Sequence, residues 1–411
     1  MSGITIYHPS KYLGGTEILF SRIIDLLIAQ GHLNISVVDF NDGILSSKFR
    51  NSAVKYYDVK NFDRNILFEN TNVISSARNI ARVLYECKRY GVIKIKPMFW
   101  LLHPSELYSG YCIGTSVLKR IGYSYLRLFI NIFPGFKIYK KIIQQLDVNS
   151  SLWIMDGACR NESEWALNYN FRNDVILPLI TNLDQHILSY ERGNIRKIAI
   201  LSRLDDFKIH GIVKLLDDVI AYNILNPSAK ITVSVIGDGS GKGMLEKKYN
   251  QKLNLNFLGY VNADKLTDLF ELEQFSALFA MGTSTLEGCS RGIPTILLPS
   301  TDEPIVNRDN IYRYMHLSEG FDLGEYLNTP FESKGYMNFK EVIDYFEKNV
   351  SEISEKSSLF FERGYRKDVT QEKLLDVIMG LKSISIDNVM MSKSFLIYTR
   401  LLSSKRLHSG V

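Results

Sequence analysis

The sequence predicts an α/β protein with two doubly wound parallel sheets, one in each of two domains that face a cleft. Short runs rich in β-branched and aromatic residues alternate with helical patterns up to residue 180, and the alternation restarts at residue 197. Strands that alternate with helices form parallel sheets through right-handed crossovers. A chain of 411 residues also exceeds one hydrophobic core of ordinary size. We therefore expect a first domain at 1–185, a linker at 181–194, a second domain at 195–382 and a basic tail or helix at 383–411.

The first domain is expected to begin with a strand at 3–9 and a helix at 16–31. Thr16 is a suitable N-cap for that helix, and Gly31 suits the position just beyond its end. The remaining strands of this domain are predicted at 34–40, 53–59, 65–75, 98–104, 151–156 and 174–180.

The second domain repeats the same pattern of strand and helix. In open parallel sheets ligands bind outside the carboxyl ends of the strands, so the residues that directly follow each strand are the candidates for chemistry. The strands of this domain are predicted at 197–204, 231–239, 255–261, 276–282 and 293–299.

Composition narrows the class of protein. The formal net charge of +5 is a mild bias, and the sequence contains no zinc-finger spacing and no RNA-binding motif, so a nucleic-acid partner is not expected. The four cysteines are scattered without a CxxC pair, which indicates reduced thiols and neither a disulfide framework nor a metal site. The N-terminus enters a strand pattern directly, and no apolar run is long enough to cross a bilayer. We expect a cytoplasmic protein.

Two cations follow the first strand of the second domain. Arg203 and Lys208 lie in a loop that leads into a helix, where a planar guanidinium and an ammonium can hold a diphosphate. The alternative is that both are surface charges paired with Asp205 and Asp206.

A turn rich in hydroxyl groups follows the strand at 276–282. Gly282 allows close approach of a ligand to the backbone, Thr283 and Ser284 supply hydroxyls, and Glu287 lies in the first turn of the next helix. A carboxylate there repels phosphate but accepts hydrogen bonds from ribose hydroxyls. The alternative is helix capping by Thr or Ser, with Glu287 as a surface residue that favours the helix dipole.

The first domain offers weaker candidates. Gly14 and Gly15 precede a helix, where they suit an oxygen-rich ligand or a purely geometric turn. His8 and His103 both follow strands and precede a proline, and His103 is the better candidate for contacting a sugar hydroxyl or moving a proton. A structural histidine that bonds a turn is the alternative.

A basic, aromatic segment lies in the first domain. No acidic residue occurs between Leu107 and Leu146, and Pro134-Gly135 is expected to divide the segment into two helices. Such a segment suits an anionic membrane surface, while a basic groove for an anionic acceptor and an ordinary solvated face are the alternatives. The predicted membrane-surface residues are Lys119, Arg120, Arg127, Phe133, Lys137, Lys140 and Lys141.

The second half resembles the donor-binding domain of GT-B glycosyltransferases, in particular the large retaining family 4. The matching motifs occur in the family's order as ILSRLDDFKIHG, VSVIGDGSGKGMLE, LNFLGYVNADKLTDLF and LFAMGTSTLEGCSRGIPTILLP, and they cover residues 197–299. The glycine-rich second motif is neither a Walker A loop nor a dinucleotide fingerprint, and we expect it to be a structural turn.

The resemblance implies roles for individual residues. Arg203, Lys208 and the turn Gly282-Thr283-Ser284 would bind the diphosphate of a nucleotide-sugar, and Glu287 would bind the ribose. Gly259, Tyr260 and Val261 would lie against the base, and His103 would position the sugar or the acceptor. The family's first glutamate is replaced here by Phe279, eight positions before Glu287.

The activity that the resemblance implies is transfer of a hexose from a UDP- or GDP-sugar to a hydroxyl of a lipid-linked saccharide, without metal or cofactor and with retention. Synthesis of O-antigen, capsule or lipopolysaccharide at the inner face of a bacterial membrane is the expected setting. Two alternatives stay open: a degenerate member that binds nucleotide-sugar or membrane as a partner subunit, and a GT-B nucleotide-sugar 2-epimerase that would use first-domain carboxylates such as Asp39, Glu106 and Asp156.

Overall fold

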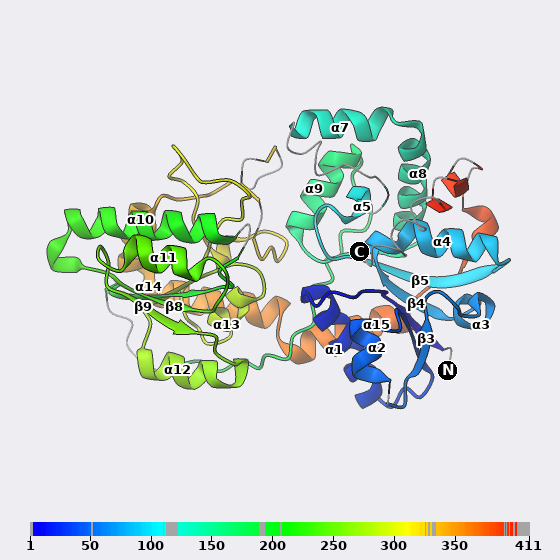
Figure 1. Cartoon of the computed structure of the whole chain (residues 1–411), viewed down its shortest axis with the longest axis horizontal. Coiled ribbons are helices and arrows are strands. Elements are labelled where there is room, and N and C mark those ends of the chain that lie inside the picture. The colour runs from blue at the N-terminus through cyan, green and yellow to red at the C-terminus, as the bar shows by residue number, and fades with distance from the viewer. Residues whose placement is uncertain are drawn as a thin grey trace. The chain divides into compact units, whose positions relative to one another are not determined.

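The fold comes from a computed structural model in which the chain forms two compact units. The first unit comprises Met1–Ile180 together with Thr370–Val411, and the second comprises Thr181–Val369. Figure 1 shows a sheet with flanking helices in each unit. The structure describes residues 3–50, 52–109, 111, 122–188, 194–205, 208–324, 326–327, 329–330, 334–389, 391, 393, 395–397 and 399–400.

The first unit is built on a seven-stranded sheet with the order β13-β5-β4-β1-β2-β3, in which β6 also pairs with β5. All pairs are parallel except the edge pair of β13 and β5. The strands are β1 (Ile4–Tyr7), β2 (Ile35–Asp39), β3 (Lys55–Asp58), β4 (Asn72–Ser76), β5 (Lys94–Leu101), β6 (Leu152–Ile154) and β13 (Ile384–Ser385).

Helices cover both faces of this sheet, because successive strand residues point to opposite sides. Ile6 packs into a core with Phe20 of α1 and Leu374 of α15, whereas the neighbouring Tyr7 packs into a second core with Leu84 of α4 and Ile130 of α7. One group of helices is α1 (Gly15–Ala29), α2 (Ile44–Phe49) and α15 (Lys367–Met379). The other is α3 (Arg64–Phe68), α4 (Ile80–Arg89), α7 (Tyr123–Ile132), α8 (Pro134–Val148) and α9 (Gly157–Leu167).

The second unit has a six-stranded sheet with the order β12-β11-β10-β7-β8-β9. Only the edge pair of β12 and β11 is antiparallel. The strands are β7 (Lys197–Leu201), β8 (Thr232–Ile236), β9 (Leu255–Gly259), β10 (Ala277–Ala280), β11 (Thr295–Leu297) and β12 (Arg313–Tyr314). On one face pack α10 (Ile209–Leu225), α11 (Lys242–Tyr249) and α14 (Phe339–Gly364), and on the other packs α12 (Leu266–Glu273).

The domain boundaries in the structure differ from the predicted ones. The prediction ended the second domain at residue 382. The chain returns to the first unit at Thr370. Leu374 and Ile378 are fully buried in the core of that unit, and the side-chain amide of Asn72 donates to the Ile378 carbonyl at 3.0 Å. The apolar face of α15 therefore covers the first sheet. Residues 401–411 of the predicted tail lie outside the described residues.

Three local expectations also change. The N-cap of α1 is Gly14 instead of Thr16, and no side chain caps it. The run at 174–180 forms only an isolated bridge between Ile176 and Ile154, since Pro178 has no N–H to donate to a ladder. Residues 181–188 of the predicted linker pack on the second unit, where the backbone N–H groups of His186 and Leu188 donate to the carbonyls of Ser290 and Arg291.

Two local expectations are confirmed. Gly31 follows the end of α1 with a φ of +77°, a conformation that favours glycine. Pro134 is the first residue of α8 and separates it from α7, because its ring lacks an N–H and cannot continue the preceding helix.

We predict that Leu374→Ala destabilises the first unit by about 2–5 kcal/mol, because it opens a cavity in that core. All three tryptophans, Trp100, Trp153 and Trp165, belong to the first unit, so urea unfolding followed by tryptophan fluorescence reports on it selectively. Glu372→Ala, at an exposed position of the same helix, is the control. Equal midpoints for the two variants would contradict the placement of α15.

Candidate nucleotide-sugar site and its first-unit counterpart

The centre of the second sheet is a topological switch point. The chain moves from β7 outward through β8 and β9, and then from β10 outward through β11 and β12 in the opposite direction. β7 and β10 lie side by side, with Leu201 opposite Ala280 at their carboxyl ends. Ligands of doubly wound sheets bind at such a point, because the loops after the two central strands diverge. The loops here carry Arg203 and Gly282.

Arg203 and Lys208 form a pair of cations at this point. Arg203 is exposed, and burial together with the charge of Arg203 lowers the pKa of Lys208 to about 8. Asp205 instead accepts hydrogen bonds from the backbone N–H and the hydroxyl of Ser240, at 2.6 and 2.9 Å. Asp206 lies outside the described residues, and within the described part of the chain neither cation forms a salt bridge. The pair is therefore available to an anion.

The glycine-rich turn after β8 supports the Arg203 loop. Gly237 has a φ of +139°, and a Cβ atom there would lie 1.9 Å from the Ser202 carbonyl oxygen. The Leu204 N–H donates to the Asp238 carbonyl at 3.0 Å, and the Gly241 N–H donates to the Leu204 carbonyl at 2.8 Å. The turn therefore has a structural role: it packs against the loop that carries Arg203. The sequence motif led us to expect such a role.

The turn after β10 leaves open space next to its backbone. Gly282 has a φ of +63°, and a Cβ atom there would meet no atom within 4 Å. The Thr285 hydroxyl donates to the Gly282 carbonyl at 2.7 Å, whereas Thr283 is exposed and its side chain does not cap the helix. α13 (Ser284–Cys289) has only six residues, so its dipole is small. Attraction for an anion rests mainly on the two cations.

Glu287 is held in place by a residue that the sequence reasoning missed. Its Oε2 lies 2.7 Å from Nη1 of Arg291, and the two side chains are 14% and 7% exposed. Arg291 also donates to the Thr267 hydroxyl and lies 5.4 Å from the centre of the Phe270 ring. The spacing of four residues between Glu287 and Arg291 is the sequence signal that could have revealed the pair. A fixed carboxylate of this kind can accept hydrogen bonds from a diol.

The turn after β9 presents an exposed aromatic ring. Gly259 has a φ of +70°, and its carbonyl accepts the Gly237 N–H at 2.8 Å. Tyr260 is 76% exposed, and Val261 packs against the core. The turn combines a planar apolar surface with backbone polar groups, which suits a heterocyclic base.

Phe279, which stands in place of the family's first glutamate, is a core residue. Its side chain is fully buried, and its ring lies 5.9 Å from that of Tyr312 in an edge-on arrangement. A carboxylate at this position would be buried among apolar side chains, so the strand cannot supply one to a sugar.

The other predicted site residues belong to the first unit. Gly14 and Gly15 are exposed at the start of α1. His103 is also exposed, and its Nδ1 lies 3.0 Å from the Ser105 hydroxyl. Gly14, Gly15 and His103 thus belong to the first unit, whereas Arg203 and Lys208 belong to the second.

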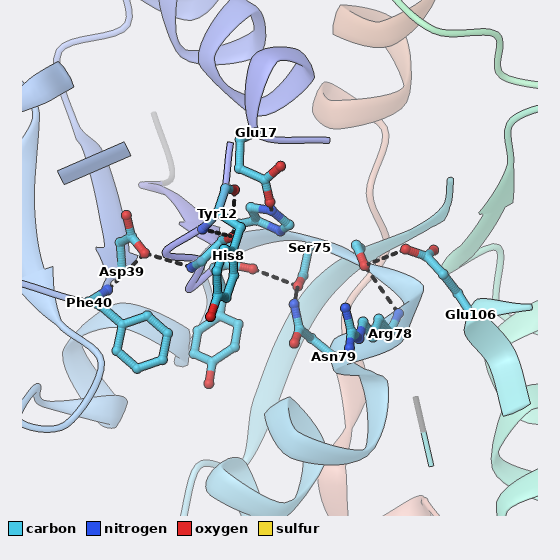
Figure 2. A network of polar contacts seen from close by, with 12 residues as sticks. His8, Tyr12, Glu17, Asp39, Phe40, Ser75, Arg78, Asn79 and Glu106 are labelled. Atoms are coloured by element: carbon cyan, nitrogen blue, oxygen red, sulfur yellow. Dashed lines mark hydrogen bonds and ion pairs between the residues drawn. The ribbon is translucent and has the colours of Figure 1, made fainter. Parts of the chain in front are cut away.

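The first sheet has its own switch point, between β1 and β4, with polar side chains after both strands (Figure 2). Of the three carboxylates considered for an epimerase, Asp39 accepts backbone N–H groups of Ser10, Phe40 and Ser46, and Asp156 caps α9. Glu106 binds the Ser76 hydroxyl and the Leu102 N–H, and burial raises its pKa to about 7. Asp39 and Asp156 thus hold backbone turns.

Several of the predicted membrane-surface residues are turned onto their own unit. Arg127 donates to the Asn168 side chain, Phe133 stacks on Phe129, and Lys140 donates to the Asn168 carbonyl. All three are half-buried, so their role at a membrane surface stays a prediction. Lys137 and Lys141 are exposed, and Lys119 and Arg120 lie outside the described residues.

An apolar ridge on α7 was missed in the sequence. Tyr125, Leu128 and Ile132 recur at helical spacing and are 61%, 58% and 56% exposed, while Leu126 and Ile130 form the buried face of the helix. Within the described ranges, no helix combines the length and apolar character needed to span a membrane.

Comparisons with known proteins identify the fold. No protein-family model matches the sequence, and no curated protein does. The apo form of the lipopolysaccharide outer core galactosyltransferase WaaB is similar over 92% of this chain and 99% of its own, with a TM-score of 0.56 and 13% identity. Anabaena HepE, solved with UDP and glucose, is similar over 93% of this chain and 100% of its own, with a TM-score of 0.51 and 13% identity. The predicted GT-B fold, with two Rossmann-like units, is confirmed.

We predict that the affinity of the protein for UDP or GDP falls as the pH rises through about 8, because Lys208 loses its proton there. Lys208→Met should weaken binding roughly tenfold, or about 1.4 kcal/mol, and flatten the pH dependence. Isothermal titration between pH 7 and 9.5 measures both effects. Lys230→Met, at an exposed position before β8, is the matched control. An unchanged pH dependence in the Lys208 variant would count against its contact with the anion.

We also predict that Glu287→Gln weakens UDP binding roughly tenfold while leaving pyrophosphate binding unchanged, because in the expected role the carboxylate accepts hydrogen bonds from the ribose and does not contact phosphate. The double variant Arg203→Ala/Lys208→Ala should weaken both ligands. Thermal unfolding without ligand checks that the loss of the Arg291 ion pair leaves the variant folded. Equal loss of pyrophosphate binding in Glu287→Gln would rule out the ribose role.

Proposed function

We propose that this chain, which has the GT-B fold, is a glycosyltransferase that moves a sugar from a nucleotide diphosphate-sugar to a hydroxyl of a saccharide acceptor. The observation that carries the proposal is the Arg203–Lys208 pair beside the open Gly282 turn at the switch point of the second unit. A half-buried, partly desolvated ammonium next to an exposed guanidinium is unfavourable unless an anion binds there.

The roles of the residues follow from the charge that develops in the reaction. When the bond between the sugar and the diphosphate breaks, negative charge builds on the leaving oxygen. Arg203 and Lys208, which lie close enough for the charge of Arg203 to lower the pKa of Lys208, would stabilise that charge without a metal ion. Glu287, fixed by Arg291, would accept the ribose hydroxyls, and the exposed Tyr260 ring would lie against the base.

The proposed identity of the donor and of the acceptor rests on the names of the similar structures. The HepE structure contains UDP and glucose, and WaaB is named as a galactosyltransferase of the lipopolysaccharide outer core. These names support a UDP-hexose donor and a lipid-linked saccharide acceptor in O-antigen, capsule or lipopolysaccharide synthesis. Retention at the anomeric carbon follows from the sequence resemblance alone, and Phe279 stands where that mechanism needs a glutamate.

A membrane role is part of the proposal. The ridge Tyr125, Leu128 and Ile132 would enter the interface of an anionic bilayer, while Lys137 and Lys141 of the next helix would contact the headgroups. We infer a peripheral location at the cytoplasmic face of the membrane, where a lipid-linked acceptor is presented.

Phe279 favours one alternative, a degenerate GT-B protein that binds a nucleotide-sugar without turning it over. The two functions differ in whether nucleoside diphosphate is released. The test incubates the full chain with UDP-glucose, UDP-galactose, UDP-N-acetylglucosamine or GDP-mannose and an octyl β-glycoside acceptor. The transferase predicts release that depends on the acceptor and is lost in Arg203→Ala/Lys208→Ala. Nucleotide binding without release from any donor supports the degenerate protein.

For the membrane, we predict that Tyr125→Ser/Leu128→Ser/Ile132→Ser abolishes flotation with phosphatidylglycerol vesicles. Lys137→Glu/Lys141→Glu should reduce flotation more at low than at high salt, because surface charges are screened. The control Ile224→Ser/Leu225→Ser removes side chains that are 73% and 79% exposed on the second unit. Equal flotation of the ridge variant and this control would contradict the proposed contact.

A further inference from the structure

The segment that follows β4 carries two arginines at the switch point of the first unit. Arg78 is exposed and lies in the short 3-10 helix η1 (Ala77–Asn79), which leads directly into α4 (Figure 2). Arg82, four residues further along, is half-buried in the first turn of α4. Residues four apart are neighbours on one side of a helix. The two side chains therefore belong to one stripe that begins at the carboxyl end of β4.

The two arginines have no counter-ion. Within the described residues, neither side chain forms a salt bridge or a hydrogen bond. Glu86, one turn beyond Arg82, is engaged elsewhere, since its Oε2 accepts from Nε of Arg64 at 2.9 Å. Burial raises the pKa of Glu106 to about 7, although the charge of Arg78 opposes the rise. Glu106 is thus about half protonated at neutral pH and neutralises Arg78 only in part.

Two further carboxylates at this edge of the sheet are engaged as well. Glu17 lies 3.0 Å from Nε2 of His8, which follows β1 (Figure 2). Asp39, at the end of β2, accepts three backbone N–H groups. These carboxylates therefore leave the positive charge of Arg78 and Arg82 uncompensated.

Two buried hydrogen-bond donors on this stripe lack an acceptor. The guanidinium carbon of Arg82 lies 5.7 Å from the centre of the Tyr7 ring at the end of β1. Nε of Arg82 and the Tyr7 hydroxyl are both buried, and neither has a hydrogen-bond partner in the part of the chain that the structure describes. Burial raises the pKa of Tyr7, so its hydroxyl keeps its proton. Buried donors without acceptors are unfavourable, and an oxyanion would supply the acceptors.

The neighbouring loop offers a surface for a sugar ring. β1 and β4 are parallel neighbours, so the loops that follow them lie at the same edge of the sheet. Tyr12 and Leu13, in the loop after β1, are both exposed. Asn79, next to Arg78, is half-buried. Aromatic and apolar side chains with a few polar groups are the usual lining of a site for a small organic ligand.

We propose that this edge of the first unit binds a phosphate group carried by the saccharide acceptor, with Arg78 and Arg82 as its binding residues. The inference rests on the proposed function, in which the donor's own phosphates are assigned to Arg203 and Lys208. An anion bound to the first unit then belongs to the other substrate. Arginine holds phosphate through parallel N–H bonds of fixed geometry.

The number of donors favours phosphate over a carboxylate. Two guanidinium groups and the Tyr7 hydroxyl offer more N–H and O–H groups than the two oxygens of a carboxylate can accept in good geometry, and a phosphate monoester has three charged or partly charged oxygens. The acceptor is therefore a phosphorylated saccharide. Its phosphate lies either on the sugar ring or in the link between the sugar and a lipid.

Direct binding tests the site without any chemistry. The full chain carries Arg203→Ala/Lys208→Ala, which removes the anion site of the second unit, and is titrated calorimetrically at low salt. Inorganic phosphate, glucose 6-phosphate and octyl phosphate should bind, and glucose should give no measurable heat. Arg78→Met and Arg82→Met should each weaken phosphate binding about tenfold, and together about a hundredfold. Arg89→Met, at the exposed far end of α4, is the matched control.

Two results of this titration overturn the proposal. One is that the phosphates bind no better than glucose, and the other is that the Arg78 and Arg82 variants bind phosphate as tightly as the Arg89 control. Thermal unfolding checks that each variant is folded, and Arg78→Met, at an exposed position, leaves the core contacts of Arg82 intact. Tighter binding of glucose 6-phosphate supports a phosphate on the sugar ring, and tighter binding of octyl phosphate supports one next to the lipid.

Transfer assays separate this inference from the proposed function. The acceptor is octyl β-glucoside 6-phosphate or octyl β-glucosyl phosphate, according to the ester that the titration prefers. Its KM should be at least tenfold below that of octyl β-glucoside, and Arg78→Met/Arg82→Met should remove most of this difference. Equal KM values in an active wild type overturn the phosphate site and leave the transferase intact. Release of nucleotide from no donor removes the proposed function, and with it the assignment of the phosphate to an acceptor.

Discussion

A reversal in the direction of the crossovers organises both halves of this molecule. In each sheet the chain moves outward from one central strand and then outward from its neighbour in the opposite direction, between β7 and β10 in the second unit and between β1 and β4 in the first. The helices that follow the two strands cover opposite faces of the sheet, so the loops between strand and helix part at the carboxyl edge. Arg203 and Gly282 flank one such point, and His8 and Ser75 flank the other.

The two points differ in their electrostatics. In the second unit, desolvation and the neighbouring Arg203 keep the pKa of Lys208 at about 8, and the nearby Asp205 is engaged with Ser240. The excess positive charge is left for a ligand. In the first unit, the Glu17 carboxylate lies 3.0 Å from the buried imidazole of His8. Within the described residues, the imidazole of the first unit therefore has a carboxylate partner, whereas the two cations of the second unit form no salt bridge.

Packing also decides which parts of the basic segment reach solvent. A run of positive charge in a sequence does not reveal which side chains turn inward. Here Arg127 and Lys140 satisfy polar groups of Asn168, whose backbone lies in the left-handed region just after α9. Two lysines of α8 and the apolar ridge of α7 stay exposed, so this part of the surface is more apolar than the sequence suggested.

The sequence by itself determined the fold class and most of the strands. Those features depend on local periodicity and turn residues, such as Gly282 with its positive φ and Pro134 at the start of α8. It also marked Phe279 as a departure from the family, because an apolar residue inside a strand stays in the core.

Only the tertiary structure decided how distant residues converge. The pairing of Glu287 with Arg291 is local in sequence, but the bond of Arg291 to Thr267 comes from another helix. The return of α15 to the first unit depends on its apolar face, in which Leu374 and Ile378 pack into the core of that unit. The environment of His8 depends on its contact with Glu17, its stacking on Phe20 and its burial together. Burial and pairing are properties of the assembled core, so no local pattern in the sequence could supply them.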